Sequence, residues 1–454
     1  MTYSWTDHIR WDEGPMYLAI AAAIDRAMDE GSLREGEGLP PHRELAERLG
    51  VALGTVTRAY AEAARVGLVR ARGRRGTSVS SRDRRGSSAV ASLGRRSEGL
   101  IDLGVNYPSP EDDPDPAQAL QTAAKSLDRR KLLRYAPPEG LPRHRAAFAA
   151  FLARTGVSVA PEQLVLCAGG QHAISLVFSS QLHPGDTLAI EALSFPGAIA
   201  AARSRNLRLL PVPFDGEGPS LGALDRACAA TRVAAFYCIP SIQNPTAGSM
   251  SEQRKKELAA LARKRDFVII EDEIHRPFLQ SPGSSFVGLA PERSFLLAST
   301  SKCVAGGLRT GAVVAPESSV DGLAEAVLDS MWCVSPLNFE LLSLWLEDGT
   351  VDRVIERRRA SGRERRDMAD RILAGHVRRA PTGTESAPFL WLELLSIPRA
   401  DFVKKAAEEG VAISPSDMFA VDSIPPEAVR ISLSGAASSE KLEVALSRLA
   451  RIMA

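Results

Sequence analysis

Seven short apolar runs follow one another along the later part of the chain, and helical patterns separate several of them. The runs are LVLCAG, DTLAIEA, RLLPVPF, VAAFYCIP, FVIIEDE, SFLLAST and GAVVAP. The clearest helical pattern, SEQRKKELAALARK, lies between the fourth and fifth runs. Strands that are apolar throughout are typical of parallel sheets covered by helices on both faces. We therefore predict a mainly parallel α/β sheet for this part of the chain.

The first eighty residues have a different character. Three helical patterns, PMYLAIAAAIDRAMDEG, PPHRELAERLG and TVTRAYAEAARVG, precede LVRARGRRGTSVS, which has the pattern of a short hairpin. This order is typical of a winged helix-turn-helix. Between residues 65 and 96 there are ten arginines and one acid, although the whole chain has a net charge of only +1. A local cationic patch beside a helix-turn-helix pattern favours double-stranded DNA as a partner.

Residues 81–98, SRDRRGSSAVASLGRRSE, are rich in Ser, Gly and Arg and poor in apolar residues. Such composition is typical of a linker, and 454 residues are too many for one ordinary domain. We predict a winged helix-turn-helix DNA-binding domain at 1–80, a linker at 81–98 and an α/β domain at 99–454.

The five cysteines are scattered and lack the CxxC or Cys/His spacing of a zinc site, so we predict no metal. Their usage favours a reduced, cytoplasmic compartment. No export signal is expected, and no run of eighteen apolar residues indicates a membrane span.

Polar residues follow three of the predicted strands. They are Asn244, Asp272, Ser299, Ser301 and Lys302, with Arg309 a little further along. In parallel sheets, ligands bind beyond the carboxyl ends of the strands. A lysine of lowered pKa can form a Schiff base, a buried acid can pair with a pyridinium nitrogen, and hydroxyls with an arginine suit a phosphate. Together these groups predict a site for pyridoxal 5′-phosphate.

The segment from about Leu100 to the end resembles the fold type I aminotransferases. The whole chain resembles the MocR subgroup of GntR-type transcription regulators, in which a winged helix precedes an aminotransferase-like domain. The motifs that carry the resemblance are TSK, GGLRTG, IIEDE, QNPTAG, AGGQHAI, LSFPG, RYAPPEG and VRISLS. It implies a PLP-dependent fold type I aminotransferase-like domain and a homodimer.

The resemblance also implies a role for each matching residue. Lys302 would form the Schiff base, Asp272 would pair with the pyridine nitrogen, and Asn244 would lie near the ring hydroxyl. The phosphate would be bound by Arg309, Ser299, Ser301, Gly170, Gln171 and, across the dimer interface, Tyr135. Phe195 would stack on the ring, and Arg430 would bind the carboxylate of a substrate or effector.

In the N-terminal part, LPPHRELAERLGVALGTVTRAY matches the GntR pattern. By this resemblance the residues that face DNA are Arg43, Thr55, Thr57 and Arg58, with Arg72, Arg74 and Arg75 in the wing. The match departs at Leu53, where the family commonly has an arginine.

A second departure is Ile274, which stands where relatives have a tyrosine that reaches the ring hydroxyl. It leaves open whether the chain catalyses transamination. We expect a PLP-binding transcription regulator that senses an amino-group-containing effector through the aldimine at Lys302 and is not primarily catalytic. The alternative is a PLP-dependent aminotransferase with an accessory N-terminal domain.

Three features nearby have simpler interpretations. His275 is either a second-sphere base or a polar residue that closes a strand, and the second is favoured. Cys303 is expected to pack as a small apolar residue. The arginine-rich segment 357–366 is expected to be a solvated, ion-paired helix face and not a DNA contact.

Overall fold

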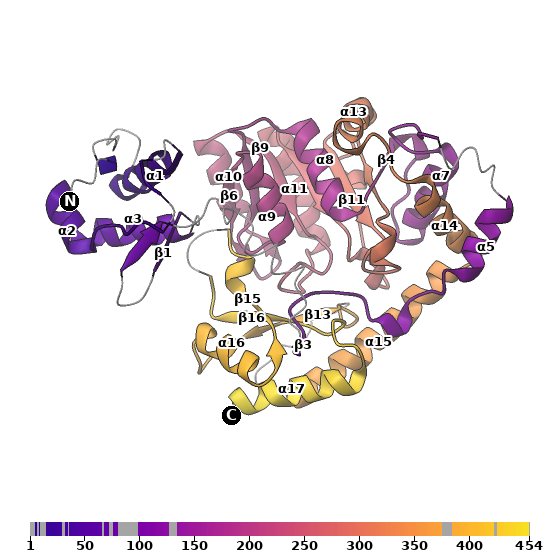
Figure 1. The fold of residues 1–454 in the computed structure, drawn as a ribbon. Coiled ribbons are helices and arrows are strands. Elements are labelled where there is room, and N and C mark those ends of the chain that lie inside the picture. The colour runs from indigo at the N-terminus through magenta and orange to yellow at the C-terminus, as the bar shows by residue number, and fades with distance from the viewer. Residues whose placement is uncertain are drawn as a thin grey trace. The chain divides into compact units, whose positions relative to one another are not determined.

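The computed structural model describes residues 5–6, 9, 15–29, 32–34, 36–65, 68–71, 76–79, 99–126, 134–374, 384–421 and 425–453. The chain forms two compact units, Met1–Arg95 and Arg96–Ala454 (Figure 1). The limits of the predicted linker remain a prediction, because residues 80–98 lie outside the described part.

The first unit contains three helices and a two-stranded ribbon. They are α1 (Met16–Asp29), α2 (His42–Leu49), α3 (Leu53–Arg65), β1 (Val69–Ala71) and β2 (Thr77–Val79). The two strands pair antiparallel, and α2 ends at Gly50, whose φ of 64° suits glycine. Apolar positions of all three helices, such as Ile24, Leu45 and Val56, are buried in a common core. The predicted winged helix-turn-helix is confirmed.

The second unit is built on a seven-stranded sheet in the order β4-β12-β11-β10-β9-β5-β6. The strands are β4 (Leu164–Cys167), β5 (Thr187–Glu191), β6 (Arg208–Val212), β9 (Val233–Cys238), β10 (Val268–Asp272), β11 (Ser294–Ser299) and β12 (Gly311–Val314). Only β12 runs antiparallel to its two neighbours. Each predicted apolar run is one of these strands, which confirms the mainly parallel sheet.

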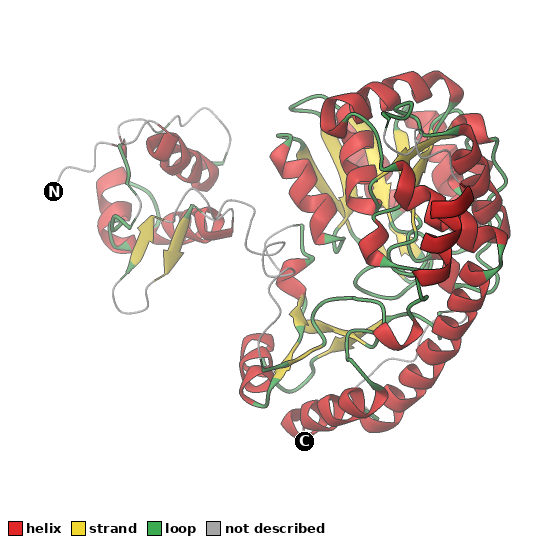
Figure 2. Cartoon of the chain, turned by 45° about the vertical axis from the view of Figure 1, so that its right-hand side comes forward, coloured by secondary structure: helices red, strands yellow, loops and turns green. Residues whose placement is uncertain are grey.

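Helices cover both faces of this sheet, as Figure 2 shows. Ile270 of β10 packs in the same apolar cluster as α8 (Gly170–Gln181), α9 (Pro196–Ser204) and α13 (Val320–Met331). Ile269 packs in the cluster of α10 (Leu221–Ala230), α11 (Glu252–Arg265) and α12 (Phe286–Leu289). Further helices at one end of the sheet are α5 (Ala117–Ser126), α7 (Pro142–Arg154) and α14 (Pro336–Glu347). Side chains that alternate along a buried strand therefore serve two different helical layers.

The long helix α15 (Thr350–Ile372) leads to a smaller C-terminal layer (Figure 1). There β13 (Phe389–Glu393), β16 (Ala428–Ser432) and β15 (Ser414–Pro415) form an antiparallel sheet, packed with α16 (Arg399–Glu408) and α17 (Ser439–Met453). The short strand β3 (Ile101–Asp102) pairs with β14 (Val411–Ala412). The segment after β3 is thereby fixed next to residues more than three hundred positions away. A remaining ribbon consists of β7 (Phe214–Asp215) and β8 (Gly218–Pro219).

The expected solvated face of α15 is wrong for three of its arginines. Arg358, Arg365 and Arg366 are buried, with exposed fractions of 5%, 2% and 4%. Arg358 donates to the carbonyl oxygen of Lys302 at 2.8 Å and to the carboxylate of Asp113 at 2.7 Å. Partners from other parts of the fold therefore bind guanidinium groups that the local sequence predicted to be exposed to solvent. None of the helices in the described part combines the length and apolarity that a membrane crossing requires.

Candidate ligand site at the carboxyl edge of the sheet

Lys302 follows β11, and its amine lies at the edge where the parallel strands end. The half-buried side chain donates a hydrogen bond from Nζ to the carbonyl oxygen of Asn106 at 2.5 Å. Burial, together with the cations Arg430 and Arg309, lowers the pKa of Lys302 to about 8. A substantial fraction of the amine is therefore neutral close to physiological pH, which a lysine needs in order to act as a nucleophile.

Asp272 ends β10 on the face that α8 covers. Its carboxylate accepts hydrogen bonds from the hydroxyl of Tyr237 at 2.6 Å and from the backbone N–H of Ile274 at 3.2 Å. Burial raises the pKa of Asp272 to about 6. Among the described residues no cation pairs with this carboxylate, so a protonated ring nitrogen would supply the charge that the site lacks.

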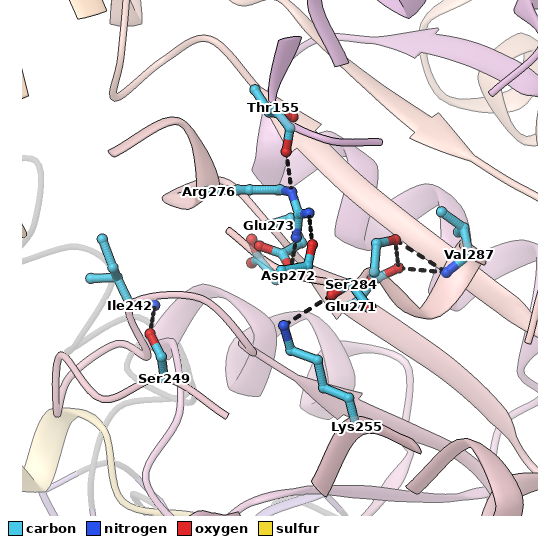
Figure 3. A network of polar contacts seen from close by, with 12 residues as sticks. Thr155, Ile242, Ser249, Lys255, Glu271, Asp272, Glu273, Arg276, Ser284 and Val287 are labelled. Carbon is cyan, nitrogen blue, oxygen red and sulfur yellow. Dashed lines mark hydrogen bonds and ion pairs between the residues drawn. The ribbon is translucent and has the colours of Figure 1, made fainter. Parts of the chain in front are cut away.

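The two acids beside Asp272 are engaged by other side chains, and Figure 3 shows the three acids together. Glu271 accepts a hydrogen bond from the hydroxyl of Ser285 at 2.8 Å. Glu273 forms a buried ion pair with Arg276 at 3.2 Å. Only Asp272 of the three acids therefore faces the layer to which Ile270 and α8 belong.

A cluster of anion-binding groups surrounds the start of α8. Backbone N–H groups in the first turn of a helix have no acceptor within the helix. Arg309 donates to the carbonyl oxygen of Ala168 at 2.8 Å and to the hydroxyl of Ser301 at 3.3 Å. Ser301 in turn accepts a hydrogen bond from Ser299 at 2.9 Å. A guanidinium, two hydroxyls and a helix start, here at Gly170, are the groups that bind phosphate.

Gly169 and Gly170 allow this close approach. Gly169 has a φ of 81°, and a Cβ atom placed on it would lie 2.8 Å from Nη2 of Arg309. A Cβ atom on Gly170 would collide with Cδ1 of Ile274. The side chain of Ile274 thus packs on the start of α8, and it has no hydroxyl with which to reach a ring oxygen.

Gln171 and Phe195 lie close together between α8 and α9. The side chain of Gln171 donates to the carbonyl oxygen of Gly197 at 3.0 Å, so its backbone N–H is the group left for a phosphate. Phe195 is half-buried and precedes the first residue of α9. Its ring and the amide of Gln171 both lie where a side chain on Gly197 would stand.

Arg430 is a buried guanidinium whose hydrogen-bond partners among the described residues are neutral. It donates to Oδ1 of Asn244 at 2.8 Å and to the carbonyl oxygen of Gly104 at 2.6 Å. The rings of Phe389 and Phe419 lie 5.5 and 4.8 Å from its central carbon. Nε has no partner, and burial lowers the pKa of Arg430 to about 10. Asp102 is close enough to oppose this lowering, but no carboxylate of the described part is hydrogen-bonded to Arg430, so the guanidinium suits a carboxylate ligand.

Two further residues have a bearing on the site. Tyr135 is 80% exposed, and its ring lies 5.7 Å from that of the exposed Trp332. The described residues of this one chain do not bring it to Lys302, and its role across a dimer interface stays a prediction. His275 is buried 3.4 Å from Asn106, and burial with nearby Lys302 and Arg430 lowers its pKa to about 3. The ring is therefore uncharged, and the preference for a polar residue that closes a strand over a second-sphere base stays a prediction.

The sequence did not single out Tyr237 or Asn106. Tyr237 gave one weak signal, because it is a residue with a polar hydroxyl in the otherwise apolar run that precedes Asn244. Nothing local pointed to Asn106, whose role depends on β3 pairing with β14. In the described part, no three His, Cys, Asp or Glu residues gather as a metal site would require.

The residues predicted to face DNA lie in the first unit. Arg43, Thr57 and Arg58 are exposed and Thr55 is half-buried. The guanidinium of Arg58 stacks 4.4 Å from the ring of Tyr17, while the hydroxyl of Thr57 donates to the carbonyl of Leu53 at 3.0 Å. The predicted wing contacts at Arg72, Arg74 and Arg75 lie outside the described residues.

Comparisons with known proteins agree with this division. Residues 98–449 match the family "Aminotransferase class I and II", and residues 16–79 match "Bacterial regulatory proteins, gntR family". The HTH-type transcriptional regulator YdeF of Bacillus subtilis, described as uncharacterized, is 27% identical over 99% of this chain and 97% of its own length. TauR of Rhodobacter capsulatus, an HTH-type transcriptional regulator, is 27% identical over 90% of both chains.

Among solved structures, the α-aminoadipate aminotransferase LysN of Thermus thermophilus, complexed with N-(5′-phosphopyridoxyl)-L-leucine, is similar to this chain. It is 30% identical, covers 81% of this chain and 94% of its own, and has a TM-score of 0.72. The fold of the present chain, the polar residues at its strand ends and its N-terminal winged helix agree with these comparisons. The chain belongs to the aminotransferase class I and II family and has the organisation of the MocR-type transcription regulators, with a GntR helix-turn-helix in front of the aminotransferase-like domain.

Proposed function

We propose that the protein is a cytoplasmic, homodimeric transcription regulator whose aminotransferase-like domain binds pyridoxal 5′-phosphate and senses an amino-group-containing effector. The observation that carries the proposal is a lysine of lowered pKa close to a buried arginine whose Nε has no hydrogen-bond partner in the described part. LysN supports the choice of cofactor, because its structure contains a phosphopyridoxyl group. YdeF and TauR support regulation, because both are described as transcriptional regulators.

When bound, pyridoxal 5′-phosphate supplies an aldehyde for a primary amine and a pyridinium ring that withdraws electrons. Lys302 would hold it covalently, Asp272 would keep the ring nitrogen protonated, and Phe195 would stack on the ring. The phosphate would be bound by Arg309, Ser299, Ser301, Gly170, Gln171 and the partner copy through Tyr135. Asn244 would approach the ring hydroxyl, and Arg430 would bind the effector carboxylate.

Cofactor binding is tested by adding pyridoxal 5′-phosphate to the full chain and to Lys302→Ala. The parent is expected to gain a visible absorption band that survives gel filtration, and Lys302→Ala is expected to lose it. Lys256→Ala changes an exposed lysine on α11 and is the matched control. A band of equal intensity in Lys302→Ala would refute the assigned attachment.

Sensing is tested by DNA footprinting upstream of the protein's own gene and its neighbours. A ligand shifts a regulator only if it binds two arrangements with different affinity. Loaded protein is therefore expected to differ in affinity or footprint from the cofactor-free form and from loaded protein with effector. Three identical footprints of equal affinity would overturn sensing and leave cofactor binding intact.

An aminotransferase is the second candidate, because Lys302, Asp272, Asn244 and Arg430 are also compatible with catalysis. Ile274 weighs against it, because a methyl group cannot donate to the ring hydroxyl as a tyrosine would. A half-reaction assay decides between the two. Rapid conversion of the bound cofactor to its amine form by a common amino acid, at a physiological rate, would favour the enzyme.

A further inference from the structure

We propose that the effector carries a small, uncharged, apolar side chain, which occupies a cavity next to Lys302. The cavity lies between residues 106–112 and α15, and it is enclosed by the apolar side chains of Pro108, Phe278, Pro388 and Leu433. The inference deepens the proposed function, on which it rests, because it names the class of amino compound that the site accepts.

The cavity is continuous with the site already described. Asn106 and Lys302 both line it, and the carbonyl of Asn106 holds the amine of Lys302. On the other side, the amide of Asn106 lies 3.4 Å from His275, whose ring is 5.3 Å from that of Phe389. Phe389 also contacts Arg430. An amino acid that meets the cofactor aldehyde beside Lys302 and binds Arg430 through its carboxylate would therefore have its side chain close to this cavity.

The size of the cavity limits the side chain. Its volume is about 30 Å³, and one water-sized group needs about 10–15 Å³ on the same scale. Two or three non-hydrogen atoms fit, as in L-2-aminobutyrate or L-valine. On one side the lining segments pack closely, since a Cβ atom on Gly362 of α15 would lie only 2.7 Å from the carbonyl oxygen of Ser386.

Several of the polar groups around the cavity are already engaged within the protein. Ser434 donates to Oδ1 of Asn106 at 3.0 Å, and Ser386 donates to the carbonyl of Phe278 at 2.6 Å. Arg358 donates through both terminal nitrogens. A polar group brought into this space would lose water and meet donors and acceptors that are largely engaged, which disfavours it.

Arg365 is engaged in the same way, since it donates to the carbonyl of Leu433 at 2.8 Å and pairs with Glu111 at 3.1 Å. The Nε atoms of Arg358 and Arg365 have no partner, but neighbouring atoms enclose them completely, so they do not offer a donor to the cavity.

The charges around the cavity disfavour both kinds of ionised side chain. Arg358 and Arg365 line it and oppose a second cation, while Asp112 lines it and opposes a carboxylate. A lysine-like side chain would have to desolvate its charge next to these two cations. A glutamate-like side chain would have to do so next to Asp112 and beside arginines that are already paired with Asp113 and Glu111. The remaining class is the small aliphatic amino acids.

The test uses full-length protein loaded with pyridoxal 5′-phosphate and isothermal titration calorimetry, with the Lys302-dependent visible band as a second readout. The probes are L-alanine, L-2-aminobutyrate, L-valine, L-glutamate, L-lysine and L-phenylalanine. The best of the first three is expected to bind at least tenfold more tightly than any of the last three. Tightest binding of glutamate, lysine or phenylalanine would overturn the inference.

Ser361→Leu fills the cavity from α15 without changing a residue assigned to the cofactor. It is expected to weaken L-valine binding at least tenfold and to leave the visible band in place. Ser361→Val gives a smaller, graded loss if the leucine variant does not fold. Glu364→Leu, an exposed position of the same helix, is the control and should bind like the parent.

Two failures can be told apart. If the parent gains no band with pyridoxal 5′-phosphate, the proposed function fails and takes this inference with it. If the band forms but Ser361→Leu and Ser361→Val bind L-valine like the parent, only the inference is overturned.

Discussion

At the scale of single residues, burial and the neighbouring cations Arg430 and Arg309 all lower the pKa of Lys302. In the cofactor-free protein, labelling by an amine-reactive reagent is expected to have its midpoint near pH 8, against about 10.4 for an ordinary lysine. Peptide mass spectrometry after short labelling pulses from pH 6 to 11 measures this. A midpoint above pH 10 at Lys302 would contradict the assignment.

The same shift has a consequence for stability. Because the pKa of Lys302 is lowered by folding, the unfolded chain binds more protons between about pH 8 and the ordinary lysine value. The free energy of unfolding therefore gains a contribution that rises with pH across this window. Urea titrations of the cofactor-free parent and of Lys302→Met should show the rise in the parent only, and parallel curves would refute it.

Some residues of the candidate site could be predicted from the sequence, and others could not. Lys302, Asp272 and Asn244 could be predicted, because an apolar strand fixes where the polar residue after it lies. Asn106 and Tyr237 could not, because their partners come from other strands and helices. The burial of Arg358 was missed for the same reason, since a helical pattern shows alternating charges but not which side is covered.

At the scale of elements, the start of α8 has glycines at positions 169 and 170, and the second of them contacts Ile274. Gly170→Ala is expected to destabilise the protein by about 1–3 kcal/mol, as overpacking does, because the added methyl group would collide with Ile274. Ile274→Ala should restore most of the loss in the double variant, which denaturant unfolding of all four proteins measures. Additive effects would show that the two side chains do not compete for this space. Gly288→Ala, where a Cβ would meet nothing, is the control.

The helix α15 connects the large sheet to the C-terminal layer through its buried arginines. Arg358→Ala would leave the carbonyl of Lys302 without this donor, and a loss of about 1–3 kcal/mol is expected, as when a buried acceptor is left unsatisfied. Arg363→Ala, a half-buried position on the same helix, should change stability by only about 0.5 kcal/mol. If Arg358→Ala and Arg363→Ala lowered the free energy of unfolding equally, in both thermal and urea unfolding, the contacts of the buried Arg358 would not contribute to stability.

At the scale of the whole molecule, a nearly neutral chain concentrates its cationic character near the winged helix. Arg43→Ala is expected to weaken DNA binding at all sequences and to lower the slope of log K against log salt by about 1, if the guanidinium meets a phosphate. Fluorescence anisotropy at several salt concentrations measures the slope. Arg263→Ala, an exposed ion-paired residue of α11, should leave it unchanged. An unaltered slope in Arg43→Ala would remove this residue from the interface.

Lys302 contacts, through its amine nitrogen, a segment that is almost two hundred positions away in the sequence. Its amine holds the carbonyl of Asn106, while its own carbonyl is held by Arg358, which also binds Asp113. When a ligand engages the amine, the carbonyl of Asn106 would lose this donor, whereas the side chain of Asn106 would keep its contacts with Ser434 and His275. A chemical change at a single nitrogen would therefore alter one backbone contact of the segment from Asn106 to Asp113 without requiring turnover.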